Sequence, residues 1–245
     1  MLVTQSLHQL PTASGSMQTR VYRPDSEGCF PAIIFYSEIF QETAPISRMA
    51  CMLAGHGFAV LVPEIFHELN PPGTVLGYDD SGKDKGNSDK LSKPLEAHDD
   101  DTQALVDFIR AQPWSRGRIG AMGVCVGGHL AFRAALNPDI AAAFCLYATD
   151  IHSGAIPSAP GNDSLSRCRD IRAELVMIWG KQDPHVPSEG RRLIQQRLEQ
   201  CQLLYSWQEL NAQHAFMRDG DPRYDPALAL QMYQQALALF QRRLN

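Results

Sequence analysis

The chain has 245 residues, with 22 Lys and Arg against 27 Asp and Glu and a formal net charge of −5. Because a surface that binds nucleic acid needs clustered basic side chains, this mild acidity argues against a nucleic-acid partner. The longest apolar run, residues 140–148, is much shorter than the roughly 20 residues that span a bilayer, so no membrane partner is expected.

Short β-branched runs alternate along the chain with longer segments of helical periodicity. This alternation is typical of an α/β fold with a mostly parallel central sheet. In chain order, the predicted elements are a strand at residues 17–22, a strand at 31–37, a helix at 44–56, a strand at 58–63, a helix at 95–111, a strand at 118–124, a helix at 127–136, strands at 141–147 and 175–179, a helix at 188–200, a strand at 204–210 and a helix at 225–244. No repeat or change of composition divides the chain, so we expect a single domain over residues 1–245.

One segment, residues 64–94, interrupts this alternation because it is dense in Pro, Gly and charged residues. Loops of this length are uncommon unless they are functional or mobile. We therefore expect a long polar excursion that either forms part of a lid or is a mobile surface loop. The acidic run His98–Asp101, which follows it, is expected to be a solvated helix start rather than a metal site, because acids favour a helix N-terminus.

A glycine-rich motif, Gly123-Val-Cys-Val-Gly-Gly128, lies between a predicted strand and a predicted helix. A tight strand-to-helix turn exposes its apex side chain above the sheet edge and needs small neighbours two positions before and after. At this apex Cys125 would lie at the positive end of a helix, which favours the nucleophilic thiolate. The alternative is a buried structural cysteine beside glycines that only pack a strand against a helix.

Two further candidates follow later strands, with the acid before the histidine. Asp183 comes after the strand at residues 175–179, and His214 comes after the strand at 204–210. The carboxyl ends of parallel strands meet at one sheet edge, so the order Cys125, Asp183, His214 fits a Cys-His-Asp triad. Asp183 could instead be an ordinary turn residue, and His214 could be a surface histidine. His185 is the alternative candidate for the general base.

Four motifs occur in the order Tyr36-Ser-Glu-Ile-Phe40, Gly123-Val-Cys-Val-Gly-Gly128, Gly180-Lys-Gln-Asp-Pro-His-Val-Pro187 and His214-Ala-Phe-Met-Arg218. Together they resemble the dienelactone hydrolase family, which has the α/β-hydrolase fold with helices on both faces of the sheet. The resemblance extends over about residues 19–239.

The resemblance implies an enzyme that cleaves a small ester or enol lactone, as a carboxymethylenebutenolidase does. Cys125 would be the nucleophile, His214 the general base and Asp183 the acid that orients the imidazole. No cofactor and no metal are implied, and the expected partner is a small-molecule substrate. The alternative is a non-catalytic member of the same fold that binds a small carboxylate or a partner.

The resemblance also assigns roles outside the triad. Glu38 would hold the resting cysteine and help to deprotonate it, and Arg218 would bind a substrate carboxylate. The backbone N–H groups of Ile39 and Val126 would form the oxyanion hole, which suits an acyl-transfer reaction. Without the family, Glu38 could face solvent and Arg218 could pair with acids on the surface.

The 6 cysteines lie far apart and include no Cys-x-x-Cys pair and no grouping at zinc-finger spacing. A disulfide framework is therefore not expected. Free thiols are typical of a reducing compartment, and the first residues lack the apolar core of a signal peptide. We expect a cytoplasmic protein.

Overall fold

The computed structural model describes residues 1–245 and contains one 8-stranded sheet in the order β1-β2-β4-β3-β5-β6-β7-β8. The strands are β1 (Val3–Thr12), β2 (Gly15–Pro24), β3 (Phe30–Tyr36), β4 (Ala59–Pro63), β5 (Ser115–Val124), β6 (Ile140–Leu146), β7 (Glu174–Gly180) and β8 (Tyr205–Leu210). The strands from β4 to β8 in this order are parallel, whereas β1 and β2 are antiparallel to their neighbours at one edge. The prediction of an α/β fold with a mostly parallel sheet is confirmed.

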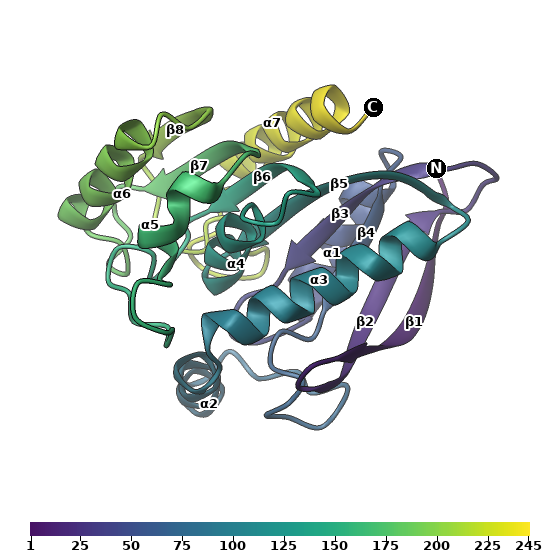
Figure 1. The fold of residues 1–245 in the computed structure, drawn as a ribbon, viewed down its shortest axis with the longest axis horizontal. Helices are drawn as coiled ribbons and strands as arrows, with labels where there is room; N and C mark the ends of the chain where they lie inside the picture. The colour runs from purple at the N-terminus through teal and green to yellow at the C-terminus, as the bar shows by residue number, and fades with distance from the viewer.

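Helices cover both faces of this sheet. They are α1 (Ala44–Ala54), α2 (Asp80–Ser92), α3 (Leu95–Ala111), α4 (Val126–Ala134), α5 (Ser164–Arg167), α6 (Ser188–Gln200) and α7 (Pro226–Leu244), with a 3₁₀ turn, η1 (Cys168–Asp170), after α5. Helices α3, α4 and α6 pack on one face, and α1 and α7 pack on the other (Figure 1). None of these helices combines the length and the apolar character that crossing a membrane requires.

The central strands are buried on both faces, which explains their consecutive apolar residues. In β3, the side chains from Ala32 to Phe35 have no exposed surface, and alternate residues belong to the two separate core clusters. Because the parallel strands all point the same way, the loops after β3, β5, β7 and β8 meet at one edge of the sheet.

The sequence patterns missed strand β1, helix α2, the short helix α5 and the turn η1. Strand β1 is a polar edge strand that pairs with β2 along its whole length, from Val3 opposite Pro24 to Thr12 opposite Gly15, so it has little hydrophobic alternation to detect. Helix α2 lies inside the segment interpreted as a loop, and that interpretation is wrong for residues 80–92. Asp79 caps α2 by accepting a hydrogen bond from the Gly82 N–H at 2.8 Å, which stabilises a helix that has almost no apolar face.

Helix α2 lies against the loop that follows β3. A Cβ atom added at Gly86 would lie 2.6 Å from the carbonyl oxygen of Ile39, so only glycine permits this close packing. The Leu76 N–H donates to the Phe40 carbonyl at 3.1 Å and attaches the approach to α2 to the same loop. The segment after β4 therefore crosses the carboxyl ends of the central strands, where the candidate site lies.

Candidate active site

Cys125 occupies a strained turn between β5 and α4. Its backbone has φ 60° and ψ −125°, a left-handed conformation that is costly for any residue with a Cβ atom. The flanking glycines allow the turn to close: a Cβ at Gly123 would lie 1.9 Å from the carbonyl oxygen of Gly127, and a Cβ at Gly127 would lie 2.1 Å from that of Tyr36. The motif therefore has the steric requirements of a turn that exposes its apex side chain.

Asp183 and His214 lie in the loops after β7 and β8, and they form a hydrogen-bonded pair. The Nδ1 atom of His214 lies 2.7 Å from Oδ2 of Asp183, and the two side chains are only 6% and 1% exposed. The other oxygen, Oδ1, accepts the backbone N–H of His185 at 2.8 Å. The carboxylate is thus held in place from both sides, and the Nε2 atom of His214 remains available to Cys125.

The charge state of His214 depends on its neighbours. Burial lowers the pKa of this imidazole, but the adjacent Cys125 sulfur and the hydrogen bond to Asp183 outweigh burial and raise the pKa of His214 to about 9. The ring of His185 lies edge-on to that of His214, with centroids 4.6 Å apart. Because the His185 ring makes no hydrogen bond to Asp183, the geometry of a base held by an acid belongs to His214.

Glu38 and Arg218 come from opposite ends of the chain and form a buried ion pair. Glu38 is 2% exposed and Arg218 7%, so neither residue is the solvent-facing charge that was the alternative interpretation. One oxygen of Glu38 accepts the Tyr78 hydroxyl at 2.7 Å, and the other accepts the Arg218 guanidinium. Arg218 also pairs with Asp221 at 3.1 Å and lies over the Tyr78 ring, with its Cζ atom 4.3 Å from the centroid. Both Glu38 oxygens are occupied, and neither bonds to Cys125, so the predicted contact with the resting cysteine stays a prediction.

The backbone N–H groups of Ile39 and Val126 make no hydrogen bond within the protein. Val126 is the first residue of α4, where helix geometry leaves N–H groups without a partner. Ile39 and Cys125 line the same cavity. Unpaired donors beside a candidate nucleophile are suited to bind the negative oxygen of a tetrahedral intermediate.

The cavity above Cys125 has a volume of about 160 Å³, and its walls are rich in positive charge. Helix α2 contributes Lys83 and Lys90, and the chain after His214 contributes Arg223 alongside Arg218.

Asp150 is the one acidic residue in the lining, and it pairs with Lys90 at 2.9 Å. The sequence reasoning gave a lid from residues 64–94 as one alternative, but it did not single out Lys83, Lys90 or Arg223. The capping residue at the start of α2 was the available signal, since the helix has no apolar periodicity.

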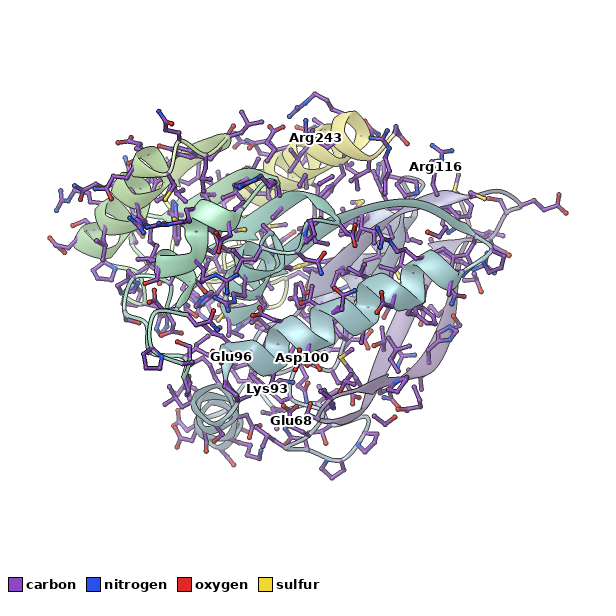
Figure 2. The ribbon with its side chains drawn as sticks, viewed as in Figure 1. Glu68, Lys93, Glu96, Asp100, Arg116 and Arg243 are labelled. Atoms are coloured by element: carbon purple, nitrogen blue, oxygen red, sulfur yellow. The ribbon has the colours of Figure 1, made fainter.

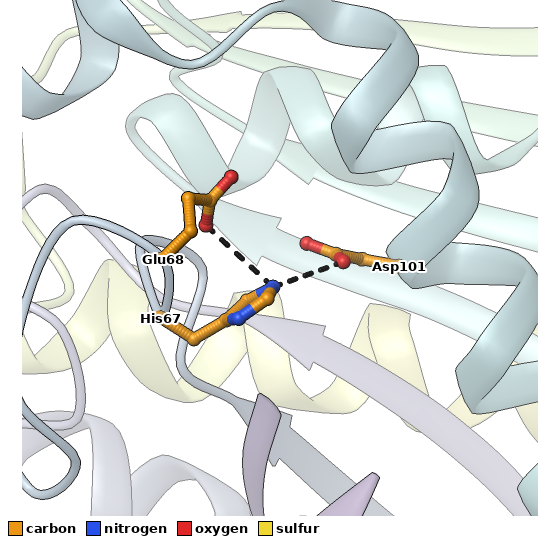
Figure 3. A group of neighbouring side chains, drawn as sticks. All are labelled: His67, Glu68 and Asp101. Carbon is orange, nitrogen blue, oxygen red and sulfur yellow. Dashed lines mark hydrogen bonds and ion pairs between the residues drawn. The ribbon is translucent and has the colours of Figure 1, made fainter. Parts of the chain in front are cut away.

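A second polar group lies away from this cavity, where α2 ends and α3 begins (Figures 2 and 3). His67 Nε2 lies 3.1 Å from Oδ1 of Asp101 and 3.5 Å from Oε2 of Glu68. The fully buried ammonium group of Lys93 contacts Asp101 at 2.6 Å and Glu68 at 2.7 Å, so the two carboxylates share one positive charge between them. We interpret this group as an ion-pair cluster that joins the end of α2 to α3.

The expectation that the run His98–Asp101 is a solvated helix start is wrong for most of the run. Asp100 is exposed, but His98 and Asp101 are buried and Asp99 pairs with Arg133.

The arrangement around Cys125 combines the parts needed for acyl transfer. A cysteine thiol, a histidine held by a buried carboxylate and two unpaired backbone donors surround one cavity. These are the groups that attack a carbonyl carbon, move the proton and stabilise the oxyanion. The structure brings all the candidate residues to this region of the sheet edge.

Comparisons with known proteins agree with this picture. The model of the dienelactone hydrolase family matches residues 17–244. The chain is 38% identical over 257 aligned residues to the Saccharomyces cerevisiae protein named "Putative carboxymethylenebutenolidase", covering 100% of this chain and 94% of the relative. It is 28% identical over 197 residues to the carboxymethylenebutenolidase of Pseudomonas putida, covering 79% of this chain and 78% of that protein.

A solved structure shares the fold over the whole chain. The Klebsiella pneumoniae structure titled "Putative Dienelactone Hydrolase" superposes with a TM-score of 0.87 at 22% identity, covering 99% of this chain and 100% of the other. At this identity the similarity establishes the α/β-hydrolase fold.

Proposed function

The chain belongs to the dienelactone hydrolase family, and we propose that it hydrolyses a small ester or enol lactone through an acyl-cysteine intermediate. The observation that carries the proposal is the strained turn that holds Cys125 in the same cavity as the His214–Asp183 pair. Structural cysteines do not require an unfavourable backbone conformation, whereas an exposed nucleophile at the tip of a turn does.

In the proposed reaction, His214 takes the proton of Cys125 and the sulfur attacks the carbonyl carbon of the substrate. The N–H groups of Ile39 and Val126 stabilise the oxyanion that forms. The imidazolium then protonates the leaving alkoxide or enolate, and an acyl thioester remains on the sulfur. In the second half, His214 deprotonates a water molecule that attacks the thioester, and the acid product leaves. Asp183 holds the imidazole in the required tautomer in both halves.

The nature of the nucleophile restricts the substrate. A thiolate leaves a tetrahedral intermediate more readily than an amide nitrogen does, so attack on an amide mostly reverses. Activated esters and enol lactones have better leaving groups and proceed to the acyl-enzyme. We therefore place a peptidase well below an esterase, and we include thioesters as substrates of the same chemical type.

The positive walls of the cavity support a substrate with an anionic group. Lys83, Arg218 and Arg223 face the space above Cys125, in a protein whose net charge is negative. A substrate carboxylate would compete with Glu38 for Arg218. Its binding would release Glu38 towards Cys125, where the carboxylate would help His214 to deprotonate the thiol.

The rival proposal is a non-catalytic member that binds a small carboxylate in the same cavity. The cationic lining favours it equally, so turnover has to decide between the two. An enzyme of this kind needs a reduced nucleophile, and we propose that it works in the cytoplasm, where thiols stay reduced.

The test measures the hydrolysis of aryl esters and enol lactones, with and without a carboxylate, by wild type and Cys125→Ala. Cys29→Ala is the matched control because Cys29 is exposed, precedes β3 at the end of that strand away from Glu38, and does not line the cavity. We expect turnover by wild type and Cys29→Ala and none by Cys125→Ala. Undiminished activity in Cys125→Ala would exclude the cysteine mechanism, and ligand binding without any turnover would favour the rival.

A second test compares the thiols directly. Iodoacetamide reacts with thiolates, so near neutral pH Cys125 should be alkylated faster than the other cysteines. Peptide mapping after brief exposure measures this order. Equal labelling of Cys125 and the exposed Cys29 would contradict an activated nucleophile.

A further inference from the structure

Two cysteines outside the active site lie in direct contact. The Sγ atoms of Cys168 and Cys201 are 3.1 Å apart, although the residues are 33 positions apart in the chain. Forming a disulfide requires the sulfur atoms to approach by only about 1 Å more. No other pair among the free cysteines makes such a contact.

The pair lies near the amino ends of β7 and β8, at the opposite end of these strands from the candidate active site. Cys168 is in η1, shortly before β7 begins, and Cys201 caps the end of α6, shortly before β8 begins. The active-site loops follow the other ends of these two strands. A reaction at the cysteine pair is therefore separate from the chemistry of Cys125.

The surroundings hold both sulfur atoms in place. The Cys168 thiol also lies 3.9 Å from the carbonyl oxygen of Arg197, one helical turn before Cys201. The Arg197 side chain donates from Nε to the Leu165 carbonyl at 3.1 Å, which links α6 to α5. The two cysteines are thus fixed by contacts on both sides rather than meeting on flexible loops.

We propose that Cys168 and Cys201 are a redox modification site, which hydrogen peroxide converts to a reversible intramolecular disulfide. The Cys201 thiolate attacks one peroxide oxygen, the O–O bond breaks, and a sulfenic acid forms as the first water molecule leaves. The Cys168 sulfur then attacks the Cys201 sulfur, its proton passes to the departing hydroxide, and the second water molecule leaves. Two thiols are oxidised by two electrons in total, and the peroxide is reduced to water.

The order of attack follows from exposure. Cys201 is partly exposed, whereas Cys168 is completely buried, so peroxide reaches Cys201 first. Burial and the contact with Cys201 raise the pKa of the Cys168 thiol to about 12, which keeps it protonated until its neighbour has been oxidised. Because the resolving thiol is already in contact, disulfide formation precedes further oxidation to the sulfinic acid.

The disulfide would close a loop that contains β7 and α6. Cross-links stabilise a protein chiefly by restricting the unfolded chain, and more so for longer loops. For a loop of this length we expect the melting temperature to rise by about 5–10 °C.

The test treats the full-length protein with limiting hydrogen peroxide, blocks the remaining thiols with N-ethylmaleimide and maps the peptides without reduction. We expect a peptide that joins Cys168 to Cys201 and disappears after dithiothreitol. Cys201→Ser should lack it, and the matched control Cys29→Ser should retain it. The melting temperature of wild type should rise on oxidation and return on reduction, while that of Cys201→Ser should not respond.

Two outcomes would overturn the proposal. One is the accumulation of sulfenic or sulfinic acid at Cys201 without the cross-link. The other is a set of disulfides distributed among all the thiols, with no preference for this pair. Since the readout is a cross-linked peptide and not ester hydrolysis, the result is independent of the proposed function.

Discussion

Replacing Asp183 by asparagine tests the proposed base most directly, because the change removes a charge while preserving size. The carboxylate accepts hydrogen bonds from two groups, the His185 backbone N–H at 2.8 Å and His214 Nδ1 at 2.7 Å. In Asp183→Asn the amide oxygen would stay on the His185 N–H, which needs an acceptor, so the NH₂ group would face Nδ1. The proton of the imidazole would then move to Nε2, which could no longer accept the proton of Cys125.

We expect kcat/KM of Asp183→Asn to fall by about 10³–10⁴-fold, the loss that a wrong tautomer causes in the serine triad. That range corresponds to roughly 4–5.5 kcal/mol of transition-state stabilisation. Hydrolysis of an aryl ester measures the loss, with Asp139→Asn as the surface control and urea unfolding as the check on folding. A decrease of less than about tenfold in a folded variant would refute the assignment of Asp183 as the orienting acid.

Three further predictions concern the turn, the cavity wall and pH. Gly127→Ala should lower the free energy of unfolding by at least ~2 kcal/mol in urea titrations, because the added Cβ would overlap two backbone oxygens. The control is Gly55→Ala, which should change this free energy little because the atom nearest to its added Cβ lies at 3.3 Å. Lys83→Gln and Arg223→Gln should each raise KM for an anionic ester by about 3–10-fold and leave a neutral ester unchanged; equal effects on both esters would argue against an anionic substrate. The pKa of His214, about 9 in the folded protein, lies above its value of about 6.5 in the unfolded chain, so its contribution to stability is complete below pH ~6.5 and is lost as the pH rises through about 9. Urea unfolding between these pH values should show a steeper decline for wild type than for His214→Gln, and parallel curves would contradict the shift.

The sequence allowed the central strands and the triad candidates to be predicted because their signals are local. Gly123 and Gly127 mark the turn at Cys125, and Asp183 and His214 each follow a buried apolar strand. These patterns depend on a few neighbouring residues and on the shared direction of parallel strands.

The remaining features depend on contacts between distant residues. The Glu38–Arg218 pair joins positions that are 180 residues apart, so no local pattern reveals that both side chains are buried. Helix α2 has polar partners in place of an apolar face: Asp89 accepts a hydrogen bond from Asn70 at 2.8 Å and pairs with Lys85. Periodicity detects apolar faces, and it therefore could not identify α2.

The way in which α2 is held has a consequence for how the protein responds to electrolytes. A charge pair between partly exposed side chains, Lys90–Asp150, joins α2 to the segment after β6, whereas the sheet beneath it is closed by apolar side chains. Dissolved ions weaken exposed charge pairs, and sulfate or phosphate strengthens apolar burial. The same salt therefore acts in opposite directions on the two parts. It weakens the attachment of α2 over the cavity, and it strengthens the apolar packing of the sheet below.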